Sequence, residues 1–189
     1  MVTDTIFKSA LLSSMERLSA VHSSLQNLHD AQQSIECRCI HLRNLSEDKI
    51  GQFLSKIPTG SRNDVDYIYT IEEQNKSGDL VARLSAQLAE RQGTHPNERD
   101  YPRIIERNKP TSTLYVGRSK KLRQRLSQHL GKYAVGTFAL HLQRWAIGIE
   151  GNIEVCFLSF SETKNLHVQA IEDALWDSLM PAFGKKGPK

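Results

Sequence analysis

The sequence predicts a small α/β domain with a helical extension at its N-terminal end. Three runs rich in β-branched and aromatic residues, at 65–72, 111–116 and 152–160, are typical of strands. Between and after these runs, apolar residues recur at helical spacing, most clearly at residues 163–180. The polar, glycine-containing segment 59–64 is typical of a turn or linker, so we expect a domain boundary at about residue 60.

The first domain, residues 1–60, is expected to be a helical N-terminal region. Residues 46–56 form one predicted helix, because Ser46 is a good N-cap and Pro58 follows the end of the helix. The earlier segment, residues 4–33, predicts a long amphipathic helix. Its heptad-like apolar residues are Phe7, Leu11, Leu18, Val21, Leu25 and Leu28, with an interruption at Ser14.

The second domain, residues 61–189, begins with the first of the three expected strands. Residues 93–109 contain two prolines and many polar side chains, which predicts a loop. We therefore treat residues 75–109 as an insertion between the first two strands. Besides the last helix, this domain is expected to contain helices at 79–91, at 119–130 with Ser119 as N-cap, and at 137–146.

The composition fits a water-soluble chain that is able to bind nucleic acid. The chain has 189 residues, of which 39% are hydrophobic and 24% charged, with a formal net charge of +4. No apolar run approaches the roughly 20 residues needed to cross a bilayer. The start of the chain lacks the basic and apolar regions of a signal peptide. We therefore expect a cytoplasmic protein with no membrane partner.

The three cysteines are Cys37, Cys39 and Cys156. An odd number without a regular spacing argues against the disulfide framework of a secreted protein. Cys37 and Cys39 form a C-x-C pair, but no second ligand pair lies near them in the sequence, and structural zinc prefers four ligands. We expect reduced thiols.

The last predicted helix carries an acidic residue on its apolar face. In a helical projection, Glu172 falls between Leu175 and Trp176 within the apolar sector, whereas Asp173 and Asp177 point away. A carboxylate at such a position loses hydration and needs a cation, a basic partner or a location at the rim. The helix alone leaves a structural ion pair and a functional carboxylate equally open.

Basic residues are concentrated around the helix that follows the second strand. Arg118, Arg125 and His129 project as one polar stripe beside the apolar face of that helix, and an arginine at such a place suits phosphate binding. The alternative is a solvated basic face. Strand tyrosines are Tyr67, Tyr69 and Tyr115, which by themselves are typical of packing in a core.

Taken together, these features resemble the GIY-YIG endonuclease superfamily. The first motif corresponds to Tyr67-Ile68-Tyr69 and the second to Tyr115-Val116-Gly117. The family's arginine, ten residues after the second motif's tyrosine, corresponds to Arg125, and a His or Tyr one turn later corresponds to His129. The family's metal-binding glutamate, nine residues before a proline, corresponds to Glu172.

The resemblance implies a small, mainly antiparallel three-stranded sheet flanked by helices, and an endonuclease that cuts DNA rather than RNA. It implies one Mg²⁺ or Mn²⁺ ion at Glu172. Catalytic roles then fall to Tyr69, Tyr115, Arg125, His129 and Glu172, with Tyr69 or Tyr115 acting on the attacking water. The expected nucleic-acid contacts are Arg118, Lys120, Lys121, Lys185 and Lys186.

Two departures from the family pattern keep a second function open. Tyr67 replaces the first glycine of the first motif, and Gly184 stands where an asparagine is frequent. A GIY-YIG-like module that binds nucleic acid with weak or no cleavage is therefore the alternative. A third hypothesis makes the N-terminal helices an oligomerisation or partner-binding element, with the helix at 4–33 forming a homodimer. The alternative is that this helix packs on its own domain.

Overall fold

The structure is a computed structural model, and it describes residues 35–59, 65–94, 101–106, 108–131, 137–161 and 165–186. Seven separate positions between residues 12 and 26 are also described, and all seven are helical. The rest of the expected helix at 4–33, including every residue of its apolar stripe, lies outside the described residues. Its use as a homodimerisation element stays a prediction.

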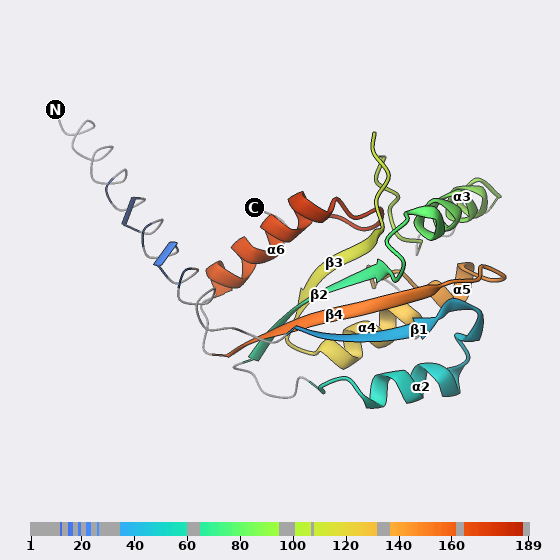
Figure 1. Ribbon diagram of the computed structural model, residues 1–189, viewed down its shortest axis with the longest axis horizontal. Helices are drawn as coiled ribbons and strands as arrows, with labels where there is room; N and C mark the ends of the chain where they lie inside the picture. Colours follow the sequence, from blue (N-terminus) through green and yellow to red (C-terminus); the bar gives the residue numbers. More distant parts are fainter. Residues whose placement is uncertain are drawn as a thin grey trace.

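The described chain has an α+β fold built on a four-stranded antiparallel sheet (Figure 1). The strand order is β1-β4-β2-β3. Three of the strands confirm those predicted from the sequence, and β4 pairs with β2 over nine residues of each strand. The strands are β1 (Glu36–His41), β2 (Val65–Glu73), β3 (Thr113–Ser119) and β4 (Asn152–Ser161).

The expected sheet of three strands was wrong, because β1 adds a fourth strand within the region expected to be helical. The short strand contains one buried hydrophobic side chain, Ile40, so it lacks a clear alternating pattern. β1 lies before the expected boundary at residue 60, but it pairs with β4, which lies after that boundary. β1 therefore belongs to the same sheet as the strands of the second expected domain. The division of the chain at residue 60 remains a prediction.

Five α-helices surround the sheet in the described residues, and their bounds largely follow the expected segments. Ser46 caps the first of them, accepting a hydrogen bond from the Lys49 N–H at 3.4 Å. The expected cap at Ser119 was wrong, because Ser119 ends β3 and Lys121 is the N-cap of α4. The helices are α2 (Glu47–Ser55), α3 (Asp79–Thr94), α4 (Leu122–Leu130), α5 (Leu142–Trp145, shorter than predicted) and α6 (Asn165–Leu179).

The two faces of the sheet bury two separate apolar clusters. Alternation along β2 sends Tyr69 into the larger cluster with the leucines of α4, and Ile68 into the smaller cluster with Val168 of α6. α4 and α6 therefore pack on opposite faces (Figure 1). In the described residues, no helix is both long and apolar enough to cross a membrane.

The C-terminal segment after α6 forms backbone hydrogen bonds on both of its sides. Phe183 N–H donates to Leu114 O of β3 at 3.0 Å, and Gly184 N–H donates to Arg103 O at 2.9 Å. Residues 103–105 of the expected insertion and residues 182–184 thus lie next to each other. This arrangement covers part of the edge of β3 and brings Gly184 beside the second motif.

The expected reduced state of all three cysteines was wrong. Cys37 of β1 lies directly opposite Cys156 of β4, and the two form a disulfide with a Cα–Cα distance of 4.1 Å. The sequence separation of 119 residues hid this pairing, since it depends on the unpredicted strand β1. Cys39 is the remaining free cysteine and is exposed.

Candidate active site

Four of the predicted site residues come together on the α4 side of the sheet. The rings of Tyr69 and Tyr115 are stacked with centroids 6.1 Å apart, and the His129 ring lies 4.4 Å from that of Tyr115. The register explains the meeting, because Tyr69 of β2 lies opposite Gly117 and Ile71 opposite Tyr115. α4 follows β3 directly and returns its side chains to the same place.

His129 is fully buried and uses both ring nitrogens. Its Nδ1 accepts a hydrogen bond from the Leu140 N–H at 3.1 Å, and its Nε2 lies 2.9 Å from the Tyr69 hydroxyl. Since Nδ1 is an acceptor, the proton of the neutral ring is on Nε2 and is donated to Tyr69. The hydroxyl proton of Tyr69 is consequently directed away from His129.

The pKa values of both groups are shifted toward their neutral forms. Burial, with the nearby charge of Arg125 as a second cause, lowers the pKa of His129 well below its ordinary value of 6.5. Burial raises the pKa of Tyr69 well above 10.0, although Arg125 opposes the shift. At neutral pH, His129 is therefore an uncharged support for Tyr69, and Tyr69 keeps its proton.

Arg125 borders this buried group from α4, and its guanidinium donates hydrogen bonds to oxygens of neighbouring residues. Its Nη1 donates to Gln128 Oε1 at 3.0 Å, and its Nη2 is 3.4 Å from the Tyr115 hydroxyl. Nη2 also donates to the backbone oxygen of Phe138. The guanidinium is thus fixed beside Tyr115.

Two glycines leave room for the tyrosine rings. A Cβ at Gly117 would lie 2.5 Å from Tyr115 Cε1 and 2.9 Å from the Tyr69 hydroxyl oxygen. A Cβ at Gly184 would lie 2.8 Å from Tyr115 Cε2, and the backbone there has a φ of +103°. The site where the family frequently has asparagine therefore has no room for a side chain while Tyr115 keeps this position.

Glu172 belongs to a second group, on the α6 side of the sheet. Its Oε2 is 3.9 Å from Nε of Arg118, and Asp66 Oδ2 is also 3.9 Å from that nitrogen. Burial raises the pKa of Glu172, as Asp173 and Asp66 also do, whereas Arg118 lowers it. Glu172 also contributes to the raised pKa of Tyr69, so the two groups interact electrostatically.

The predicted position of Glu172 agrees with its surroundings, because its side chain is only 17% exposed. Asp66 is a member of this group that the sequence reasoning missed. It lies two residues before Ile68 in β2, and the alternation of that strand already places both on the α6 side. That alternation was the signal that could have identified Asp66.

The predicted nucleic-acid contacts differ in what they touch. Arg118 also donates to Asn165 O at 3.1 Å, so this side chain is engaged at the Glu172 group. Lys186 is paired with Asp177 at 2.6 Å. Lys120, Lys121 and Lys185 are exposed, the first two immediately before α4 and the last beyond α6.

The described part of the chain thus combines a sheet flanked by helices with a buried tyrosine–histidine pair beside an arginine, and with a separate, half-buried glutamate on the other face. Residues 104–181 match the family model described as the GIY-YIG catalytic domain. Tyr115, Arg125, His129 and Glu172 fall within the match, while Tyr69 joins them through sheet pairing. Comparisons with curated proteins and with solved structures give no match.

Proposed function

We propose that this protein is a metal-dependent endonuclease that hydrolyses phosphodiester bonds in DNA. The observation that carries the proposal is the position of Arg125, fixed beside Tyr115 and the buried His129 within the segment that matches the catalytic domain. A guanidinium held in advance stabilises negative charge on a phosphoryl oxygen without a cost of reorganisation during the reaction.

Burial supports different roles for the two tyrosines. Tyr69 is 1% exposed and its pKa is raised, so it is a poor acceptor of a proton from water. Tyr115 is half-buried, and its hydroxyl lies beside Arg125. We assign the contact with the attacking water or the phosphate to Tyr115. Tyr69 and His129 are then positioning residues that hold the Tyr115 ring and the loop at Leu140.

The Glu172 group fits a hard divalent cation. Glu172 and Asp66 both direct a carboxylate oxygen toward the Arg118 guanidinium, and carboxylate oxygens are the ligands that Mg²⁺ and Mn²⁺ prefer. Glu172 would hold the ion, with Asp66 as a nearby second carboxylate. Such an ion neutralises charge at a phosphate and assists the leaving oxygen. When no ion is bound, the Arg118 guanidinium supplies the positive charge that compensates these two carboxylates.

Exposed lysines support the choice of a nucleic-acid substrate. Lys120 and Lys121 precede α4, the helix that carries Arg125, and Lys185 follows Gly184 at Tyr115. Cations so placed around the site suit contacts with flanking phosphates. Their contribution predicts a strong dependence of binding on salt concentration.

The test is nicking of a supercoiled plasmid with Mg²⁺ or Mn²⁺, compared with EDTA. Glu172→Gln and Arg125→Gln should each reduce the cleavage rate by about 100-fold or more while the circular dichroism spectrum is unchanged. Asp177→Asn is the matched control, because Asp177 lies on the same helix and forms only an exposed pair with Lys186. Cleavage at the rate of the unaltered protein in both site variants would refute the proposal.

A binding module without cleavage is the second candidate, and Gly184 is the observation that favours it. The asparagine frequent at this position in the family is replaced by a residue whose backbone and neighbours leave no room for a side chain. Binding to a labelled duplex by the unaltered protein, with no nicking under any of several divalent metals, would establish this function instead.

A further inference from the structure

Three cysteines and a glutamate lie together on two paired strands, away from the candidate active site. Cys37 and Cys39 of β1 are two residues apart, as are Glu154 and Cys156 of β4. The register places Cys37 opposite Cys156 and Cys39 opposite Glu154. Because side chains alternate along a strand, all four project from one face of the sheet.

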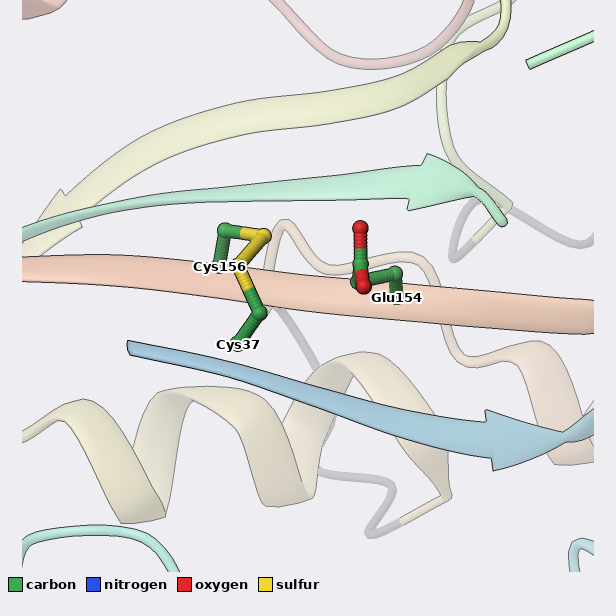
Figure 2. A group of neighbouring side chains, drawn as sticks. All are labelled: Cys37, Glu154 and Cys156. Carbon is green, nitrogen blue, oxygen red and sulfur yellow. A yellow bond between two sulfur atoms is a disulfide. The ribbon is translucent and has the colours of Figure 1, made fainter. Parts of the chain in front are cut away.

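The ligand atoms of Cys37, Cys156 and Glu154 are close enough to share one ion. The sulfur atoms of Cys37 and Cys156 and a carboxylate oxygen of Glu154 all lie within 4.8 Å of one another (Figure 2). Cys39, which lies outside this set of three, has its Sγ 3.7 Å from Glu154 Oε1 and can join the set as a fourth ligand. The C-x-C pair therefore has the second ligand pair that its sequence neighbourhood lacks.

The chemistry of the four donors selects a class of ion. Three thiolates and one carboxylate form a four-ligand set of the kind that holds Zn²⁺ and other thiophilic divalent cations, and not Mg²⁺. Lys76, which is 3.9 Å from Glu154 Oε2, offsets part of the negative charge of such a set. Cys37 and Cys39 are exposed, so an ion reaches the group from solvent.

We propose that the reduced protein binds one Zn²⁺ ion between β1 and β4 through Cys37, Cys39, Cys156 and Glu154. The Cys37–Cys156 disulfide and the bound ion are then alternative states of the same group, because a sulfur atom in a disulfide has no thiolate to offer. Reduction opens the site, and oxidation closes it.

The change between the two states balances with a dithiol as reductant. The dithiol loses two electrons and becomes a cyclic disulfide, the bond between the two cysteine sulfur atoms breaks, and the two protons of the dithiol pass to Cys37 and Cys156. Zn²⁺ then displaces the thiol protons to solvent as it binds. Release of the ion followed by two-electron oxidation restores the disulfide.

Titration with Co²⁺ under anaerobic conditions tests the proposal, because tetrahedral thiolate coordination gives Co²⁺ an intense visible spectrum. The full chain, reduced with a dithiol that is then removed, should bind one equivalent of Co²⁺, and one equivalent of Zn²⁺ should abolish the spectrum. Oxidised protein should give no such spectrum. The reduced Glu172→Gln variant should behave as the unaltered protein does, which separates this ion from the one at the candidate active site.

Variants locate the site. Cys156→Ser should abolish the stoichiometric spectrum, and Glu154→Gln should weaken binding by about 10-fold or more. Glu150→Gln is the matched control, because Glu150 forms an ion pair with Arg43 at the surface. This variant should bind Co²⁺ as the unaltered protein does. If Cys156→Ser does not fold, protection of the three thiols from alkylation by Zn²⁺ in the unaltered protein decides instead. An absent spectrum in reduced protein, or unprotected thiols, would overturn the proposal.

Discussion

The buried, uncharged His129 predicts a specific loss of stability in acid. The perturbation is His129→Gln, which removes the titrating ring and keeps a polar side chain with a donor and an acceptor. In the folded protein, burial holds the pKa of His129 well below 6.5. In the unfolded chain, the same ring has an ordinary pKa and takes up a proton as the pH falls through that value.

The pKa of His129 differs between the folded and unfolded states, and this difference sets the direction and size of the change in stability with pH. Below about pH 6.5, the unfolded state binds more protons than the folded state, so acid favours unfolding. The contribution of His129 to the free energy of unfolding is fully present above that pH. It is lost as the pH falls toward the depressed pKa of His129 in the folded state. Between about pH 7.5 and about pH 5.5, the free energy of unfolding should fall by an amount on the order of 1 kcal/mol from this residue alone.

Urea unfolding followed by circular dichroism at a series of pH values measures the effect. The decrease in unfolding free energy over this range should be smaller in the variant than in the unaltered protein, by an amount on the order of 1 kcal/mol. A constant loss of packing in the variant cancels, because only the pH dependence is compared, and the difference should be flat above about pH 7.5. Equal decreases in both proteins would mean that His129 is protonated in the folded state, contrary to our reasoning.

Further expectations concern packing and the N-terminal segment. Gly117→Ala should destabilise the fold by about 1–3 kcal/mol, because its Cβ would lie 2.5 Å from Tyr115 Cε1. Gly93→Ala is the control, because a Cβ added at Gly93 in α3 would meet no atom within 4 Å. This variant should stabilise the protein by about 0.5–1 kcal/mol in the same urea experiment. A chain that begins at Ile35 should retain the fold. If residues 4–33 of two copies pair, light scattering should show that the full chain is a dimer and the shortened chain a monomer. A chain that begins at Ser61 lacks β1 and should show reduced thermal stability; equal melting temperatures would contradict the contribution of β1.

Much of the fold was predictable because most elements carry strong periodic patterns. β2 and β4 are dense in buried apolar side chains, and α3 repeats buried leucines four residues apart. β1 was missed for a physical reason. At the edge of the sheet it is held by backbone hydrogen bonds to β4 and by the Cys37–Cys156 disulfide, and it buries one hydrophobic side chain, Ile40. Its sequence therefore shows little of its structure.

The candidate site was predictable in its members but not in its division into two groups. Tyr115 in β3 and Arg125, ten residues later, meet because α4 begins soon after β3 ends. Whether Glu172 lies with Arg125 or with Arg118 depends on the face of the sheet that α6 covers. The linear sequence does not contain that choice, which long-range packing against Ile68 and Phe160 determines.

The strand order has a consequence for the folding of the chain during its synthesis on the ribosome. β1 is among the first parts of the domain to be synthesised, yet its sheet partner lies more than a hundred residues later, as the separation of 119 between Cys37 and Cys156 shows. β1 must therefore wait until β4 has left the exit tunnel, while α2 and β2 are already available for local contacts. Pairings between such distant segments close large loops and are slow. During that interval Cys37 is without its disulfide partner, because Cys156 has not yet been synthesised.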